Sequence, residues 1–194
     1  MALDAVELRV LGCLLEKERT TPDQYPLSLN ALRLAANQST NRDPVVDYDE
    51  GTIRSALDRL GQGGWTRLAS GPGSRAAKFR HLLDDKLGLL PSQQALLTVL
   101  LLRGHQTAAE LRIRSERLYP FASGEAVETA LAALAERDLV QRLPRRPGER
   151  EERWTHLLGD SAEEPAPAAA GTLEERVAEL ERRLAALEAR FGDD

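Results

Sequence analysis

Cysteine is almost absent from this sequence, and so is any apolar run long enough to cross a membrane. The single cysteine, Cys13, cannot form an internal disulfide, which is typical of proteins in a reducing compartment. Because its neighbours are leucines and a valine, we expect a buried thiol. The longest apolar run, residues 95–102, is too short to span a bilayer, and residues 1–4 lack the basic start of a secretory signal. We therefore expect a cytoplasmic protein without membrane contacts.

The motifs of enzymes and metalloproteins are missing too. The sequence has no glycine loop that opens a helix, no CxxC and no HExxH. His81 and His156 occupy equivalent positions of an internal repeat, which favours a shared structural role, and His105 lies in a short connection. No pattern pairs these histidines with a nucleophile. The sequence thus predicts no catalytic residue, no metal ligand and no cofactor, and a protein that is not an enzyme.

An excess of positive charge, the usual sign of a nucleic-acid-binding protein, is also lacking. The net charge is −5, and it comes from the end of the chain. Residues 1–88 contain 12 basic and 12 acidic side chains, residues 89–160 contain 10 of each, and residues 161–194 contain 4 and 9. Both halves of the body are neutral, so any binding to DNA depends on how their charges are arranged.

What the sequence does contain is an internal repeat. The apolar pattern of residues 53–65 returns 74 residues later, and the Pro-Gly turn and His-Leu-Leu of residues 72–83 return 75 residues later. Upstream, Leu14-Leu15 and Thr20 match Leu101-Leu102 and Thr107 at an offset of 87. The larger offset gives the first copy 13 extra residues, which we place between its second and third helices, near residues 38–48. Such self-similarity predicts two copies of one structural unit.

Each copy is predicted to contain three helices followed by two strands. In the first copy, apolar residues recur at helical spacing after the cap residues Asp4, Ser28 and Asp49. Strands at 65–70 and 77–82 then flank a Gly-Pro-Gly turn. The predicted elements of the second copy are helices 92–103, 108–118 and 124–137 and strands 140–143 and 153–157.

Three helices and a two-stranded hairpin, the wing, form the winged variant of the helix-turn-helix. A plain helical bundle, the alternative, does not explain the paired Pro-Gly turns. The predicted fold class is therefore mainly α, an α+β winged helix, with two tandem winged-helix domains at residues 1–88 and 89–159.

The end of the chain is predicted to be a separate element. Residues 160–171 have no apolar periodicity and are typical of a linker. Residues 172–192 contain apolar side chains at alternating spacings of four and three, the pattern of a coiled coil. These predicted dimerisation residues are Leu173, Val177, Leu180, Leu184, Leu187 and Phe191. Arginine at g and glutamate at e positions favour a parallel homodimer. A helix that folds back onto its own body is the alternative.

Candidate DNA contacts follow from the third helix, which usually enters the major groove in winged helices. In the first copy its outward face carries Ser55 and Gln62, for which we predict base contacts, flanked by Arg54 and Arg59, for which we predict phosphate contacts. The same face of the second copy carries glutamates, which DNA phosphates repel. The predicted wing contacts are Arg75, Lys78, Arg146 and Arg150. Because glutamates alternate with arginines in the second wing, a self-neutralised hairpin is the alternative there.

The segments TPDQYPLSLN at 21–30 and NQSTNRDPV at 37–45 resemble the YceH-like family of bacterial proteins, and the resemblance extends over nearly the whole chain. It implies a tandem winged-helix fold and leaves the biochemical function open. The residues that it singles out are Tyr25, Pro26, Asn30, Asn37, Gln38, Asn41, Arg42 and Pro44. Polar residues of this kind brace a loop or form a recognition surface, and both interpretations stay open.

Two functions are consistent with these patterns. The first is a dimeric DNA-binding protein, similar to transcription regulators, with double-stranded DNA as its partner. The alternative is a winged-helix scaffold that binds a protein partner without binding DNA, through the acidic third helix of the second copy and the asparagine- and arginine-rich loop of the first.

Overall fold

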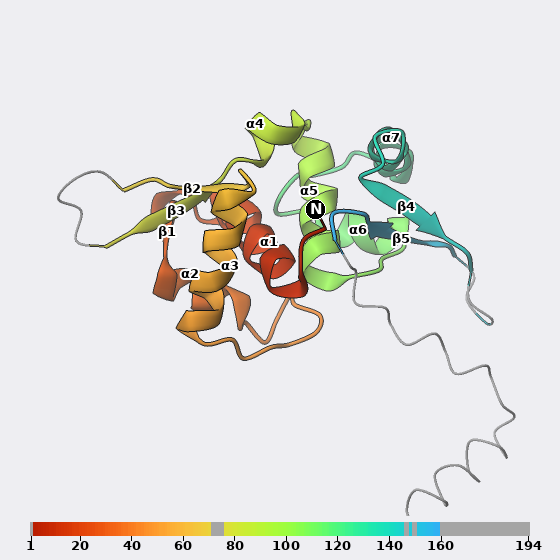
Figure 1. The fold of residues 1–194 in the computed structure, drawn as a ribbon. Helices are drawn as coiled ribbons and strands as arrows, with labels where there is room; N and C mark the ends of the chain where they lie inside the picture. Colours follow the sequence, from red (N-terminus) through yellow and green to blue (C-terminus); the bar gives the residue numbers. More distant parts are fainter. Residues whose placement is uncertain (1, 71–75, 146–147, 149–150, 160–194) are drawn as a thin grey trace, which may run out of the picture. The chain divides into compact units, whose positions relative to one another are not determined.

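The computed structural model describes residues 2–70, 76–145, 148 and 151–159, and its architecture is α+β, as expected (Figure 1). The first repeat contains α1 (Ala5–Thr20), the 3-10 helix η1 (Pro22–Gln24), β1 (Leu27–Ser28), α2 (Leu29–Ala36), α3 (Glu50–Gln62), β2 (Thr66–Leu68), β3 (Lys78–His81) and α4 (Leu83–Leu87). The second contains α5 (Pro91–Arg103), α6 (Ala108–Arg114), α7 (Gly124–Ala135), β4 (Val140–Leu143) and β5 (Arg153–His156). The predicted linker and coiled coil lie outside the described residues.

The helices begin at the predicted cap residues. The side chain of Asp4 accepts a hydrogen bond from the Glu7 N–H, and Ser28 and Asp49 do the same at the starts of α2 and α3. Such bonds satisfy N–H groups that have no partner within the helix. Three short elements were not predicted, namely η1, β1 and α4, because segments of two to five residues are too short to show a period.

The strands form two small antiparallel sheets. One has the order β1-β3-β2, with Leu27 opposite Phe79 and Thr66 opposite His81. The other pairs β4 with β5 and places Val140 opposite His156. The hairpins predicted in both copies are therefore confirmed.

The second helices of the repeats correct the predicted position of the extra residues. Thr107 caps α6 as Ser28 caps α2, and the bridge from Gln106 to Trp154 stands where β1 pairs with β3. The equivalent caps are thus 79 residues apart, and the match of Thr20 with Thr107 was wrong. Eight of the 13 extra residues precede α2, in the segment that contains η1, and five lie between α2 and α3.

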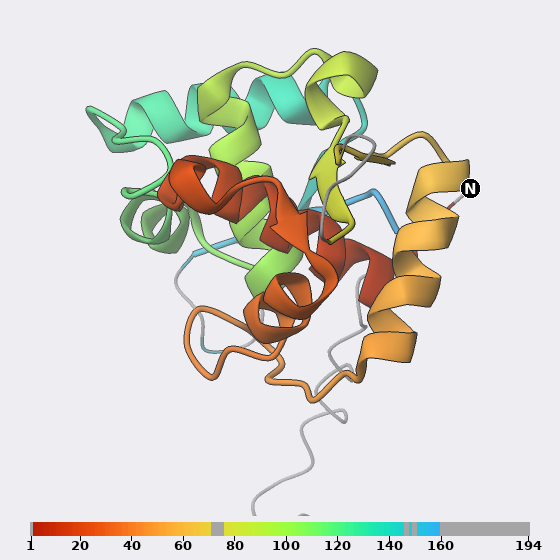
Figure 2. The ribbon, with the colours of Figure 1, turned by 90° about the vertical axis from the view of Figure 1, so that its left-hand side faces the viewer.

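The repeats pack against each other through their first helices. Figures 1 and 2 show α1 beside α5, with α3 also against α1. Residues 7–15 of α1 and 93–102 of α5 are buried on all sides, as expected of central helices. Gly12 permits this approach, because a Cβ there would lie 2.8 Å from Cδ2 of Leu102. The two repeats therefore share one core and form one compact unit.

The long apolar run of the sequence is accounted for by α5, and Cys13 is buried in α1, as predicted. Burial raises the pKa of the Cys13 thiol. Among the helices of the described residues, none is long and apolar enough to cross a membrane.

Candidate nucleic-acid interface

Helix α3 buries one face and exposes the other, as its periodicity predicts. Ile53 and Leu57 are buried in the core, while Arg54, Ser55 and Gln62 are exposed. The capped start at Asp49 and the end before Gly63 fix the length of the exposed face. Three of the four predicted contacts on this helix are thus accessible to a ligand.

The fourth predicted contact, Arg59, is held by the start of α1. One guanidinium nitrogen lies 2.5 Å from Oδ2 of Asp4, and its Nε lies 3.1 Å from Oε1 of Glu7. The same two carboxylates belong to the capping box of α1. The two ion pairs connect α3 to α1, so a DNA contact by Arg59 would require them to break.

The hairpin of the first repeat carries a row of basic side chains on its outer face. Arg67 and Lys78 are exposed, and Arg80 is half-buried. Arg67 lies directly opposite Arg80, and like charges in this position are destabilising. Within the described residues, none of these three side chains forms an ion pair, and the buried Nε of Arg80 has no hydrogen-bond partner. The face is therefore a cationic surface whose side chains form no ion pair with the described residues.

Two arginines of the second hairpin are paired with carboxylates. Arg142 lies 3.1 Å from carboxylate oxygens of both Glu128 and Glu152, and its guanidinium stacks 4.8 Å above the Trp154 ring. Arg153 pairs with Glu110 at 3.2 Å. The predicted balance of Arg146 by the glutamates of the same hairpin involves residues outside the described structure, whereas Arg142 and Arg153 are paired with Glu128, Glu152 and Glu110.

The two repeats can be aligned on the cap residues of their second helices and on their closing histidines. In this alignment, the glutamates that pair with Arg142 and Arg153 have no acidic counterpart in the first repeat. The positions of Glu110, Glu128 and Glu152 are occupied in the first repeat by Ala31, Arg54 and Ala77. All three carboxylates that pair with Arg142 and Arg153 are therefore replaced by a neutral or a basic residue in the first repeat. Of the predicted wing contacts, Lys78 is exposed, and Arg75, Arg146 and Arg150 lie outside the described residues. All predicted dimerisation residues lie outside them too.

Arg42, the central residue of the family motif, is an internal brace. Its side chain is fully buried, and it contacts both carboxylate oxygens of Glu16 at 2.7 and 3.1 Å. It also donates to the Ala35 carbonyl and to Oε1 of Gln38, both at 3.0 Å. Burial alone would raise the pKa of Glu16, but the hydrogen bonds and charge of Arg42 outweigh it and hold that pKa below its usual value.

The other motif residues also make mostly internal contacts. Asn37 accepts from the Tyr48 N–H at 2.9 Å and donates to the Tyr48 carbonyl at 2.8 Å. The remaining contacts are those of the Tyr25 hydroxyl with the His81 N–H, the Pro44 carbonyl with Arg9, Asn41 with Arg103, and Asn30 with Arg33, while Pro26 follows Tyr25 through a cis peptide. Loop bracing therefore describes most of the motif, with Asn30 and Asn41 exposed.

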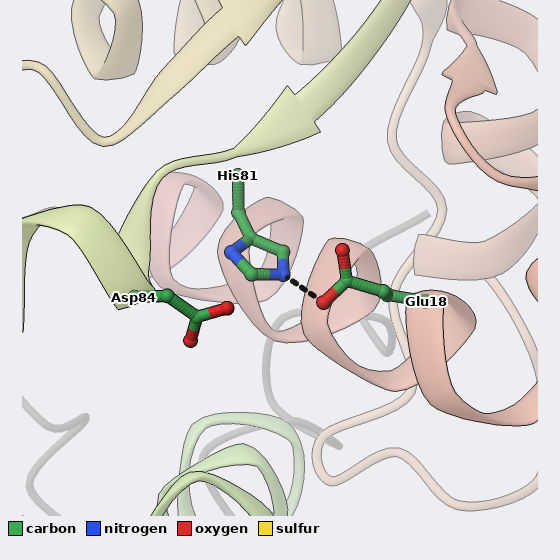
Figure 3. Close-up of side chains that lie close together, drawn as sticks. All are labelled: Glu18, His81 and Asp84. Atoms are coloured by element: carbon green, nitrogen blue, oxygen red, sulfur yellow. Dashed lines mark hydrogen bonds and ion pairs between the residues drawn. The ribbon is translucent and has the colours of Figure 1, made fainter. Parts of the chain in front are cut away.

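A histidine and two carboxylates lie together beneath the first hairpin. Figure 3 shows the His81 ring between Glu18 and Asp84, with ligand atoms within 4.8 Å of one another. Nε2 lies 2.7 Å from Oε2 of Glu18, and Nδ1 accepts from the Leu83 N–H at 3.3 Å. A metal-bound histidine normally donates its second ring proton, whereas here the neutral ring must carry its proton on Nε2. The cluster therefore does not fit a metal ion.

This pairing instead connects β3 to the end of α1. The hydrogen bond from His81 lowers the pKa of Glu18, with a smaller contribution from the charge of Arg80. Sequence reasoning did not predict this contact, nor did it predict Arg67 as part of the basic face. The alternation of Lys78 and Arg80 in the sequence indicates that both lie on one face of a strand. The position of Arg67 opposite Arg80 could be predicted only from the strand register.

Comparison with known proteins identifies relatives over nearly the full length. The family described as "Protein of unknown function, DUF480" matches residues 3–149. A UPF0502 protein of Pelobacter propionicus is 48% identical, covering 96% of this chain and 90% of the relative. A UPF0502 protein of Solibacter usitatus is 49% identical, covering 96% and 89%. The protein PC1_1804 of Pectobacterium carotovorum is 44% identical, covering 95% and 97%. The chain therefore belongs to the DUF480 family, with which the resemblance to YceH-like proteins is consistent.

Proposed function

We propose that the protein binds double-stranded DNA through its first repeat. The observation that carries the proposal is the contrast between the two hairpins. Arg54, Arg67 and Lys78 lie exposed without carboxylate partners in the described structure, whereas Arg142 and Arg153 are paired. Surplus cations on one face match the DNA backbone, which carries one negative charge per ~1.7 Å of its axis.

The fold interpretation behind this proposal is a tandem winged helix. Each repeat has three helices, then a hairpin, and a short strand or bridge that joins the second helix to the sheet. In a winged helix the third helix enters the major groove, and the wing contacts phosphates beside it. Helix α3 and strand β2 are in contact in the first repeat, so both surfaces can reach one duplex.

The roles of the residues follow from their chemistry. Arg54, Arg67 and Lys78 contact phosphates, which position the protein without reading sequence. Ser55 and Gln62 are the side chains on the exposed face of α3 that can hydrogen-bond to base edges. The proposed coiled coil of residues 172–192 joins two chains, and two linked sites bind one duplex more tightly than each site alone.

A titration of labelled random-sequence duplex by fluorescence anisotropy tests the proposal. We expect binding at low salt, with a slope of log K against log salt of about −3 for three phosphate contacts per chain. Arg67→Gln weakens binding and makes the slope shallower by about 1. Arg142→Gln, which removes the same charge from the second hairpin, is the matched control and leaves the slope nearly unchanged.

An absence of binding at low salt contradicts the proposal and favours the alternative, a scaffold that binds a protein partner. One observation supports that alternative, since the side chain of Ile113 on α6 is 73% exposed, with Tyr119 nearby in the sequence and 36% exposed. Isolated apolar residues at a surface are common, however, so the charge contrast carries more weight.

A further inference from the structure

A cavity between the two repeats has a lining that the proposed DNA interface does not use. Its volume is about 70 Å³, enough for several water molecules or one small ion with a short substituent. The end of α1 contributes Glu16 and Thr20, the loop before α3 contributes Asn41, and α5 contributes Leu102 and Arg103. The far wall comes from α6 and the residues after it, so both repeats build the cavity.

Three of the residues that line this cavity are arginines, namely Arg103, Arg114 and Arg117. Each guanidinium has five N–H donors. Arg103 uses one for Asn41, Arg114 bonds to Gln106 and pairs with Glu110, and Arg117 makes no hydrogen bond or ion pair with any described residue. Most N–H donors of Arg103 and Arg117 are therefore unused.

One carboxylate, Glu16, also lines the cavity, and its charge offsets part of the effect of the neighbouring arginines on Arg103. Glu16 is held by the buried guanidinium of Arg42 and by Lys17 at 3.1 Å. The pKa of Arg103 is lowered, first by burial and then by the positive charges of Arg114 and Arg42. The cavity thus has a local excess of positive charge.

We propose that this cavity binds a small molecule through a phosphate monoester group. A dianion with three unesterified oxygens matches the unused N–H donors of Arg103 and Arg117, with added charge from Arg114, better than a carboxylate, which has one charge and two oxygens. Leu102 and Leu118 line the same space and offer an apolar contact to a short organic substituent. The site is separate from the basic hairpin and does not depend on DNA binding.

Isothermal titration calorimetry of the full chain tests this inference with propyl phosphate, inorganic phosphate and butyrate at matched ionic strength. We expect propyl phosphate to bind most tightly, inorganic phosphate more weakly because it lacks the apolar contact, and butyrate the least. Arg103→Gln and Arg117→Gln each weaken propyl phosphate binding about tenfold, since each removes charge-assisted hydrogen bonds. Arg117 is exposed and unpaired in the described structure, so its replacement leaves the fold intact.

Arg112→Gln is the matched control, because Arg112 is exposed on α6 and does not line the cavity. Its binding of propyl phosphate stays at the wild-type level. Three results overturn the inference: no binding of either phosphate, tighter binding of butyrate, or binding that Arg67→Gln abolishes and Arg117→Gln leaves unchanged. The last result would assign the phosphate to the basic hairpin instead.

Discussion

The two repeats have the same strand register and the same closing histidine, yet they differ in how their charges are paired. In the first repeat the carboxylate of Glu16 is used inside, against the buried Arg42, and the outer face of the hairpin has unpaired cations. In the second, carboxylates lie on the surface and pair with Arg142 and Arg153. The two halves have equal numbers of acidic and basic residues, yet Arg67 and Lys78 of the first hairpin have no ion pair in the described structure, whereas Arg142 and Arg153 of the second are paired.

The largest expected difference between the repeats concerns stability. Arg42→Met removes the buried guanidinium and leaves Glu16, which is 14% exposed, with Lys17 as its remaining partner, and we expect the free energy of unfolding to fall by about 3 kcal/mol. Arg142→Met removes exposed ion pairs and lowers it by about 1 kcal/mol or less. Urea denaturation monitored by circular dichroism measures both. Equal losses in the two variants would contradict the contrast between a buried and an exposed pair.

The second largest expected difference concerns the closing histidines of the two repeats, His81 and His156. His81 has a carboxylate partner, whereas the buried Nδ1 of His156 has none in the described structure, and burial lowers the pKa of His156 from 6.5 to about 4. Between these values the unfolded chain binds more protons, so the stability falls as the pH drops from 7 to 4. The expected contribution is about 3 kcal/mol.

Urea denaturation across this pH range checks that contribution. His156→Gln removes the titrating group and should flatten the dependence of the unfolding free energy on pH. The dependence should persist in His81→Gln, because His156 is intact there. A His156→Gln protein with the wild-type pH dependence would assign the effect to other groups.

A charge reversal in the first repeat makes its surface similar to that of the second. Arg54→Glu places a carboxylate at the position of Glu128, and we expect the affinity for duplex DNA to fall about 30-fold, or roughly 2 kcal/mol. Fluorescence anisotropy at low salt measures this loss. Arg33→Glu on α2, which reverses one charge outside α3 and the hairpin, serves as the control. Equal losses in both variants would indicate an effect of net charge alone.

The smallest expected effect comes from opening the second hairpin. Glu128→Gln combined with Glu152→Gln leaves Arg142 unpaired, and we expect the affinity for duplex DNA to rise about threefold at low salt. The gain should disappear as salt is raised, because it arises from exposed charges. Unchanged affinity would place the second hairpin away from the duplex.

Local patterns were sufficient to predict the elements, and contacts between distant residues were not. The caps at Asp4, Ser28 and Asp49 and both hairpins could be read from short segments. The partners of Arg59 could not, because Asp4 and Glu7 are 55 and 52 residues away in the sequence. Such pairs depend on how helices pack, and an exposed face on a helical wheel does not show which of its cations are already paired.

The match of Thr20 with Thr107 was wrong because the sequence does not show which hydrogen bond a residue makes. Thr20 and Thr107 match as residue types, but Thr20 ends α1 while Thr107 begins α6. Identity of one residue was a weaker guide than the hydrogen bond that it makes. The bracing role of Arg42 was one of two open interpretations, and only the burial of its side chain distinguished them.

The close contact at Gly12 has a mechanical consequence. Since a Cβ at this position would meet Leu101 and Leu102 of the other repeat, the spacing between α1 and α5 is set to within the size of a methyl group. The N–H of Leu3 also bonds to the Leu158 carbonyl at 3.0 Å, so the two ends of the body are joined. Both hairpins therefore belong to one packed unit, and a bulkier residue at position 12 would separate the helices that carry them.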